Sequence, residues 1–417
     1  MKVLIITYYW PPAGGSGVQR WLYFVKYLRD FGIEPIVYTV ENPAYPILDT
    51  SLEELVPAGV TVIGNKIWEP NSWFQKKNQV AAGFLPQKPT LSQKFIRYIR
   101  ANYFIPDARK FWVKPSVKKL NQYLQTHPVD WIISTGPPHS LHLIGQRLHQ
   151  KTGIKWLADF RDPWTDIDYF HQLPLTRKSL IKHQKLEKSV IQSATTVVVV
   201  SNEMQKAYAA FTDNCHVITN GYDGDIVSNP ILDTPFTMTH IGMLNADRNP
   251  VFFWEVIREL LDSNEAFEEA VQINLVGKIS DEVKQSIRQF DLEKYINYSN
   301  YVPHQTVYKL QRKSQVLLLF INRVPSAKGI VTGKFFEYLQ AQRPILAIAP
   351  EEGDLAKIIK ETQSGSLVGF DDKEALTNTI IALFTAYQSN NLTVNTVGID
   401  KYHRKNLTGE LAKLLKK

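Results

Sequence analysis

The sequence has little cysteine and no long apolar run, and each shortage excludes a class of protein. Cys215 is the single cysteine among 417 residues. It excludes an internal disulfide and a thiolate metal cluster built from this chain alone. No apolar stretch approaches the ~20 residues that a membrane-spanning helix needs. With 44% hydrophobic and 21% charged residues, the composition is that of a globular protein. We therefore expect a cytoplasmic protein in a reducing environment.

Positive charge is concentrated in residues 88–119, which hold nine Lys or Arg and one acid, Asp107. The formal net charge of the whole chain is +8. Aromatic residues are interleaved with these cations, which suits anionic lipid headgroups or an anionic acceptor. We predict peripheral contact with an anionic membrane at its inner face, and no nucleic-acid partner, because no nucleic-acid-binding motif accompanies the charge. The alternative is a solvated pair of helices whose aromatic residues belong to the core.

Short apolar runs alternate with amphipathic stretches, the pattern of a parallel α/β fold. Strands are predicted at Lys2–Tyr8, Glu34–Val40, Asp130–Ser134, Lys155–Asp159, Thr195–Ser201, Thr237–Leu244, Gln272–Val276, Val316–Ile321 and Ile345–Ala349. The pattern restarts after turn residues near 222–235. We predict two Rossmann-like domains, at 1–225 and 226–398, and a terminal helix at 399–417 that packs back on the first domain.

Glycines follow the first predicted strand, at Gly14-Gly15-Ser16-Gly17. Glycine lets a backbone approach a ligand closely, and the next helix directs its N–H groups at a phosphate. The dinucleotide fingerprint is incomplete, because Arg20 stands where a third glycine would lie. This disfavours a dinucleotide oxidoreductase. An ordinary tight turn is the alternative interpretation of the loop.

Two segments of the second half offer further phosphate-binding groups. The strand ending at Gly242 is followed six residues later by Arg248. The segment Thr332-Gly333-Lys334 opens a helix whose free N–H groups would hold a phosphate. Its spacing is not that of a P-loop, which excludes an NTPase of that class. Glu337 would lie one turn into this helix, where its carboxylate could bind a ribose diol.

Polar side chains also follow two neighbouring strands of the first half. Asp159, Arg161 and Asp162 come after one strand, and His139 comes after the preceding one. Open α/β sheets bind ligands at this edge. We predict that one aspartate orients an acceptor hydroxyl, that Arg161 meets a phosphate or acceptor charge, and that His139 bonds a hydroxyl. The alternatives are an Asp–Arg pair that braces the loop and a helix-capping histidine.

The motif Asp166-Ile167-Asp168 matches the short signature of metal-dependent transferases. Two acids at this spacing occur by chance in a chain of this length, so we predict no metal and no cofactor.

Together these segments resemble glycosyltransferase family 4, the retaining transferases of the GT-B fold. The resemblance runs from the glycine loop through Val276-Gly277 to Phe336-Glu337-Tyr338. It implies two Rossmann-like domains facing a cleft that holds a nucleotide-sugar, with 1–225 as the acceptor-side domain and 226–398 as the nucleotide-sugar-binding domain. It also implies donor-binding roles, and these fall on Gly15, Ser16, Gly17, Arg248, Gly277, Thr332, Gly333, Lys334 and Glu337.

The chain departs from the family pattern at two positions. Met243 stands where the family has an arginine, and Gly329 stands where it has a glutamate that touches the sugar. These departures leave the donor sugar and the retaining outcome open. The predicted function is metal-independent transfer of a sugar from a nucleotide-sugar to a saccharide or lipid-linked acceptor, in surface polysaccharide or glycan synthesis. The alternatives are a non-catalytic relative and a sugar-nucleotide epimerase of the same fold.

Overall fold

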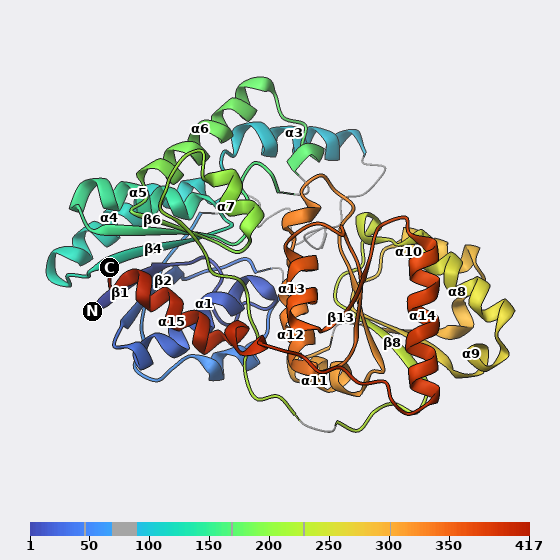
Figure 1. Ribbon diagram of the computed structural model, residues 1–417. Coiled ribbons are helices and arrows are strands. Elements are labelled where there is room, and N and C mark those ends of the chain that lie inside the picture. Colours follow the sequence, from blue (N-terminus) through green and yellow to red (C-terminus); the bar gives the residue numbers. More distant parts are fainter. Residues whose placement is uncertain (46, 69–89, 168–169, 228–229, 301) are drawn as a thin grey trace. The chain divides into compact units, whose positions relative to one another are not determined.

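The computed structural model describes residues 1–45, 47–68, 90–167, 170–227, 230–300 and 302–417. The chain divides into two compact units (Figure 1). The N-terminal unit comprises Met1–Thr219 with Arg404–Lys417, and the C-terminal unit comprises Asn220–His403. Each unit contains one parallel sheet with helices on both faces, so the predicted fold class, two Rossmann-like α/β domains, is confirmed.

The sheet of the N-terminal unit has seven strands in the order β3-β2-β1-β4-β5-β6-β7, all parallel. These strands are β1 Lys2–Ile6, β2 Glu34–Val40, β3 Thr61–Asn65, β4 Trp131–Gly136, β5 Lys155–Phe160, β6 Thr196–Val199 and β7 Cys215–Val217. The helices of this unit are α1 Ser16–Leu28, α3 Leu91–Tyr103, α4 Lys110–Thr126, α5 Ser140–Thr152, α6 Arg177–Ser193, α7 Asn202–Tyr208 and α15 Arg404–Leu415.

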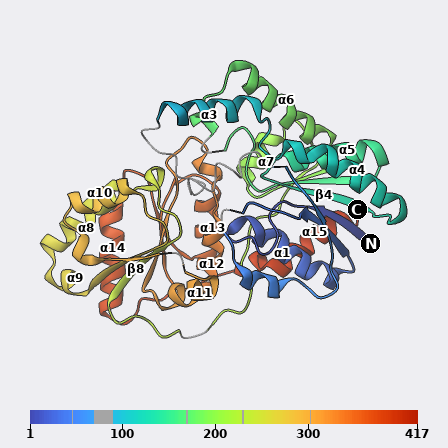
Figure 2. The same cartoon turned by 180° about the vertical axis from the view of Figure 1, so that it is seen from behind.

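Alternate residues of each inner strand serve opposite faces of this sheet, as the two-residue period of a strand requires. Leu4 and Ile6 of β1 pack with α4, α5 and α6, whereas Val3 and Ile5 pack with α1 and α15. Figures 1 and 2 show α4 and α5 on one side of the sheet and α1 with α15 on the other. The terminal helix α15 therefore belongs to the core of the N-terminal unit.

The sheet of the C-terminal unit has six parallel strands in the order β10-β9-β8-β11-β12-β13. They are β8 Phe236–Ile241, β9 Val271–Val276, β10 Ile296–Ser299, β11 Val316–Phe320, β12 Ile345–Ile348 and β13 Gly365–Val368. The helices are α8 Val251–Ser263, α9 Glu265–Ala270, α10 Asp281–Gln289, α11 His304–Lys313, α12 Gly333–Ala341, α13 Asp354–Thr362 and α14 Lys373–Gln388. One face packs on α8 and α14, and the other packs on α12 and α13.

Both sheets reverse their strand order at one point, between β1 and β4 in the first and between β8 and β11 in the second. Loops that leave such neighbouring strands at their carboxyl ends diverge to opposite faces, and the crevice between them is where open α/β sheets bind ligands. The glycine loop that precedes α1 follows β1, and Gly242 follows β8. The fold thus places both sequence motifs at a topological switch point.

Candidate functional site

The C-terminal unit forms a glycine corner where β8 and β9 end. Gly242 and Gly277 have φ values of 121° and 122°, a backbone conformation that side chains disfavour. A Cβ atom on Gly277 would lie 2.6 Å from the carbonyl oxygen of Gly242. The two loops therefore meet through bare backbone, and this close approach requires glycine at position 277.

Two cations lie at this corner. A Cβ atom on Gly242 would lie 2.8 Å from Nζ of Lys334, so the ammonium group sits directly against the glycine. The Arg248 guanidinium donates from Nη1 to the Met243 carbonyl at 3.3 Å and from Nε to the Asn322 side-chain oxygen. Asn322 lies just after β11, so Arg248 links the two strands that flank the switch point.

The electrostatics of the corner favour an anion. Burial and repulsion from Arg248 hold the pKa of Lys334 well below its ordinary value, while Glu337 acts in the opposite direction. Burial, Lys334 and Arg248 likewise depress the pKa of His240, whose Nε2 lies 3.4 Å from Lys334 Nζ. Two like charges in a partly buried place disfavour each other. A diphosphate bound there would relieve that repulsion.

Helix α12 begins beside the same groups. Thr332 is its N-cap residue, but its side chain makes no capping hydrogen bond, and its Oγ1 is buried without a partner among the described residues. The first N–H groups of a helix carry a partial positive charge that suits a phosphate. Gly333 and Lys334 are the first two residues of the helix. Glu337 lies one turn further in, is 9% exposed, and accepts a hydrogen bond from Gln311 at 3.2 Å.

In the N-terminal unit, Arg161 joins the loops that follow β1, β4 and β5. Its guanidinium donates to the backbone carbonyls of Gly17, Gly136 and Pro137. Its carbon Cζ also lies 5.9 Å from the ring centroid of Tyr9. A Cβ atom on Gly17 would lie 3.4 Å from the same guanidinium, so the glycine loop and Arg161 are in direct contact. Gly15 precedes the helix with a φ of 85°.

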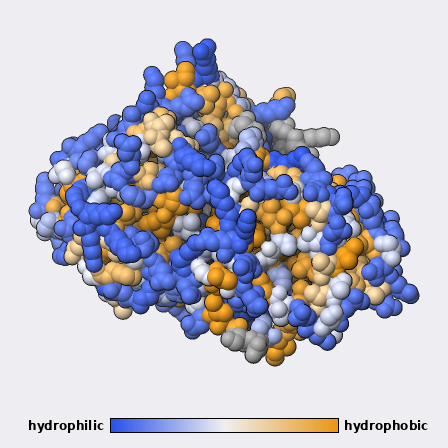
Figure 3. All heavy atoms as spheres, viewed as in Figure 1, coloured by the Kyte–Doolittle hydropathy of each residue, from blue (hydrophilic) through white to orange (hydrophobic). Residues whose placement is uncertain are grey.

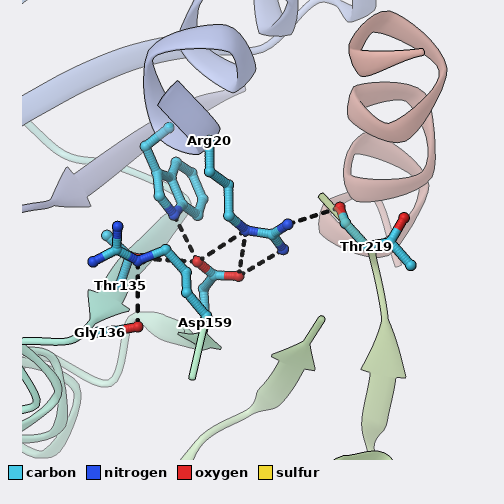
Figure 4. Close-up of polar contacts among 7 residues, drawn as sticks. Arg20, Thr135, Gly136, Asp159 and Thr219 are labelled. Atoms are coloured by element: carbon cyan, nitrogen blue, oxygen red, sulfur yellow. Dashed lines mark hydrogen bonds and ion pairs between the residues drawn. The ribbon is translucent and has the colours of Figure 1, made fainter. Parts of the chain in front are cut away.

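Asp159, two residues before Arg161 in the chain, is fully buried. Its carboxylate pairs with Arg20 and accepts hydrogen bonds from Trp21 and Thr135 at 2.7 and 2.8 Å (Figure 4). Burial opposes ionisation of this carboxyl, but the Arg20 charge and these hydrogen bonds hold its pKa below its usual range. The alternative interpretation, an Asp–Arg pair that braces the loop, does not hold for Asp159, whose ion-pair partner is Arg20. The catalytic role of Asp159 stays a prediction.

The other predicted residues of this unit surround Arg161. His139 is the N-cap residue of α5, makes no capping bond with its side chain, and stacks on Trp164 with ring centroids 4.7 Å apart. Its Nδ1 has no hydrogen-bond partner among the described residues. Asp162 is half-buried and favours the charged form of Arg161 electrostatically. The catalytic roles of all three stay predictions.

Two predictions fall on residues or side chains that the structure does not describe. Ser16 opens α1, but its side chain lies outside the described parts, and so does Asp168. Asp166 is exposed. In the described part of the chain, no group of three or more His, Cys, Asp or Glu could hold a metal ion. Metal independence stays a prediction.

Four residues that complete these sites were not predicted from the sequence. Arg20 was noted only as a missing glycine, and nothing in the sequence pairs it with a residue 139 positions away. His240 lies on β8 beside the glycine corner. Asn322 follows a buried strand and could have been found by that position alone. Gln311 contacts Glu337 from α11, which no sequence spacing indicates.

The comparison with protein families identifies the C-terminal unit. Residues 235–386 match the family model described as Glycosyl transferases group 1. The chain carries a group 1 glycosyltransferase domain. The matched segment contains the glycine corner, Arg248, Lys334 and Glu337, so the enzyme class predicted from the sequence, a glycosyltransferase, is confirmed at the level of the family.

Solved structures of glycosyltransferases share the fold of this chain over nearly its whole length. Sucrose-phosphate synthase from Thermosynechococcus elongatus matches with a TM-score of 0.64 at 13% identity, covering 100% of this chain and 98% of that chain. WaaG, a glycosyltransferase involved in lipopolysaccharide biosynthesis, matches with a TM-score of 0.59 at 12% identity, covering 99% of each. These likenesses confirm the GT-B fold.

A third similar structure is the UDP-forming α,α-trehalose-phosphate synthase from Burkholderia xenovorans in complex with glucose-6-phosphate. It matches with a TM-score of 0.63 at 10% identity, covering 100% of both chains. No curated protein sequence matches the chain. Within the described residues, no helix has both the length and the apolar character needed to cross a membrane.

Proposed function

We propose that this group 1 glycosyltransferase moves a sugar from a nucleotide-sugar to a saccharide or lipid-linked acceptor without a metal. The observation that carries the proposal is the convergence of Arg248, Lys334 and the start of α12 on Gly242. Glycosyl transfer expels a nucleoside diphosphate, whose negative charge must be stabilised as the bond to the sugar breaks. Preorganised cations and N–H dipoles supply that stabilisation.

Each group at the corner has a distinct role in this proposal. We call the glycine corner together with Arg248, Lys334 and Glu337 the donor corner. Arg248 and Lys334 hold the two phosphates, and the N–H groups of Gly333 and Lys334 bond the phosphate oxygens. Glu337 binds the ribose diol, and its hydrogen bond from Gln311 fixes the carboxylate orientation. The bare backbone of Gly242 and Gly277 lets Lys334 and the two loops pack closely at the sheet edge, which positions the ammonium group for the diphosphate. Retention of the anomeric configuration belongs to the proposal, although Met243 and Gly329 depart from the pattern of the retaining family.

The acceptor belongs to the N-terminal unit in this proposal. Arg161 is a cation held by three loops at the switch point of that sheet, where it can meet an acceptor charge. WaaG is a glycosyltransferase involved in lipopolysaccharide biosynthesis, and the trehalose-phosphate synthase structure is a complex with glucose-6-phosphate. By analogy with WaaG, we propose that this chain acts in surface polysaccharide or glycan synthesis.

Membrane contact is the other part of the proposal. Helix α3 exposes Leu91, Phe95 and Tyr103 at 84%, 64% and 65%, and Ala101 is its one buried residue. Figure 3 shows apolar atoms among hydrophilic ones over the part of the N-terminal unit that carries α3 and α6. Apolar side chains surrounded by cations suit the interface of an anionic membrane. We place the protein at the inner face of the membrane on this basis. Lys88, at the start of the predicted basic segment, lies outside the described residues.

A thermal-shift titration with UDP, GDP, ADP and dTDP and their sugars tests the donor site. A nucleotide present at a hundredfold its dissociation constant should stabilise the protein by about 2.7 kcal/mol. Arg248→Ala and Glu337→Ala should abolish the shift. Arg323→Ala is the control, since this arginine forms an exposed pair with Asp371 in the same unit. A protein that shifts with none of the nucleotides would refute the proposed donor site.

Turnover distinguishes the proposed transferase from the two alternatives of the same fold. A transferase releases nucleoside diphosphate in proportion to acceptor, whereas an epimerase changes the sugar-nucleotide without acceptor. A non-catalytic relative binds nucleotide and releases nothing. Chromatography of the nucleotide pool with and without a crude lipid-linked saccharide fraction separates the three outcomes.

A further inference from the structure

Helices α4 and α5 of the N-terminal unit pack side by side and leave a groove of about 560 Å³ between them. Four cations line it, Lys114 and Lys118 from α4 and Arg147 and Lys151 from α5. All four side chains belong to exposed residues. None of them forms an ion pair with a residue in the described part of the chain. The groove has the volume of a small-molecule site, about 300–1,000 Å³.

The remaining polar groups of the groove are neutral. Asn121, Gln122 and Gln125 project from the same face of α4 and add amide hydrogen-bond donors. No carboxylate is among the described residues that line it. A groove that offers cations and amide donors without an acid is complementary to an oxyanion, and it repels metal cations.

The arrangement costs helix stability when the groove is empty of anions. Lys114 and Lys118 stand four residues apart on one helix, and so do Arg147 and Lys151 on the other. Like charges at this spacing destabilise a helix. The like-charge pair of each helix therefore lines the groove together with the like-charge pair of the other helix. A multiply charged anion between them would turn both repulsions into attraction.

The groove is part of a cationic face. Helices α3, α4, α5 and α6 together contain fourteen Lys or Arg and a single acid, Glu187, which is buried. The formal charge of these four helices thus exceeds the +8 of the whole chain. Such a face concentrates anions from solution and guides them to the groove, where the four cations converge.

We propose that the α4–α5 groove binds a phosphate-bearing ligand that carries two or more negative charges. The ligand is either a soluble phosphate chain or saccharide phosphate, or the headgroup of an anionic lipid. This site lies in the N-terminal unit and uses no residue of the donor corner, so it does not depend on the proposed glycosyl transfer. The exposed cations meet phosphate oxygens, and the amides of α4 complete the hydrogen bonds.

Calorimetric titration with tripolyphosphate tests the site directly. The titration uses the full chain with Arg248→Ala and Lys334→Ala, so that the donor corner contributes no binding. Adding Lys118→Gln and Arg147→Gln should weaken tripolyphosphate binding at least about tenfold, because two charge-assisted contacts are lost. The matched control adds Lys178→Gln and Lys185→Gln on α6, which removes the same charge from the same cationic face outside the groove. The control should stay within about twofold of its parent.

Hydrogen exchange locates the ligand, and vesicles identify its source. Tripolyphosphate should slow amide exchange in 110–126 and 140–152. Binding to tripolyphosphate alone assigns the groove to a soluble phosphate. Binding to phosphatidylglycerol vesicles alone assigns it to lipid headgroups, provided that binding is lost in the variant with Lys118→Gln and Arg147→Gln (the groove variant). Equal weakening by the groove and control variants would overturn the proposal, as would an absence of binding to both probes or protection elsewhere in the chain.

Discussion

Arg20 and Asp159 form a buried ion pair, with Nη2 of the arginine 2.8 Å from Oδ1 of the aspartate. Their side chains are 3% and 1% exposed. The pair connects α1 to the end of β5, and Arg20 also donates to the Thr219 carbonyl at 2.8 Å (Figure 4). The carboxylate also accepts a hydrogen bond from Thr135 near the end of β4. The pair therefore fixes the base of the N-terminal switch point.

Asp159→Asn should be strongly destabilising, because it leaves the Arg20 charge buried without its partner. Removing one member of a buried pair typically costs about 3–5 kcal/mol. Urea unfolding of the purified variant measures the loss. Arg29→Gln is the control, since it breaks an exposed pair with Glu34 that solvent screens, and it should leave stability almost unchanged.

A double variant separates charge from packing at the same place. Asp159→Leu combined with Arg20→Met replaces both charges by apolar groups, and it should recover most of the stability that Asp159→Asn loses. If the double variant is as unstable as Asp159→Asn, the hydrogen bonds from Trp21 and Thr135 matter more than the ion pair.

Gly242→Ala should weaken nucleotide binding at the donor corner. The added methyl group would lie 2.8 Å from Lys334 Nζ and would displace that ammonium group. The φ of 121° also strains any side chain at this position. A loss of about tenfold in nucleotide affinity is expected from one displaced charge contact, measured by calorimetry. Gly153→Ala is the control for backbone strain, since its φ is 71° and its Cβ would have no neighbour within 4 Å. It should lower stability but keep nucleotide affinity.

The sequence predicted the interior strands of both sheets well and missed the strands at their edges. β3, β7, β10 and β13 are the four missed strands, and each is the outermost strand of its sheet. An interior strand of a parallel sheet is covered on both faces and reads as a continuous apolar run, such as Val197–Val200. Edge strands are partly exposed and short, so β10 is polar after its first residue and β7 has three residues. Their apolar signal is too weak to separate from loops.

The donor corner was predictable where it depends on strand ends, and unpredictable where it depends on distant packing. Gly242 and Arg248 were found because they follow a buried strand. The contact of Lys334 with Gly242 joins positions on β8 and α12 that only the fold brings together. The Arg20–Asp159 pair was missed for the same reason. From the sequence alone, a charged residue inside a helix is predicted to be exposed unless its buried partner is known.

His142 should make the N-terminal unit less stable in mild acid. Burial is the main cause that lowers its pKa to about 3, although Asp159 opposes the shift. An unfolded chain holds this imidazole at a pKa near 6.5, so between about pH 6.5 and pH 3 the unfolded state binds the additional proton. Stability is therefore retained above pH 6.5 and falls as pH decreases through that window, by about 1.4 kcal/mol per pH unit. Urea titrations at closely spaced pH values measure the slope. His142→Phe should reduce the slope by about 1.4 kcal/mol per pH unit without removing it, because burial also lowers the pKa values of His139 and His183 in the same unit. A variant curve that runs parallel to the parent would contradict the assignment.

Leu91→Ser with Phe95→Ser should abolish vesicle binding by α3 while leaving the fold intact. Both side chains are exposed, so their loss removes no core contact, whereas each would contribute roughly 1.5–3 kcal/mol if buried in the lipid interface. Co-sedimentation with phosphatidylglycerol vesicles should fall at least about tenfold. Ile231→Ser is the matched control, because this residue is 92% exposed and belongs to the C-terminal unit.

Reversing the charges at Arg97, Arg100, Arg109 and Lys110 should also weaken vesicle binding, in a salt-dependent manner. Binding unchanged by both sets of substitutions would exclude α3 as the membrane contact and leave its apolar face to another partner.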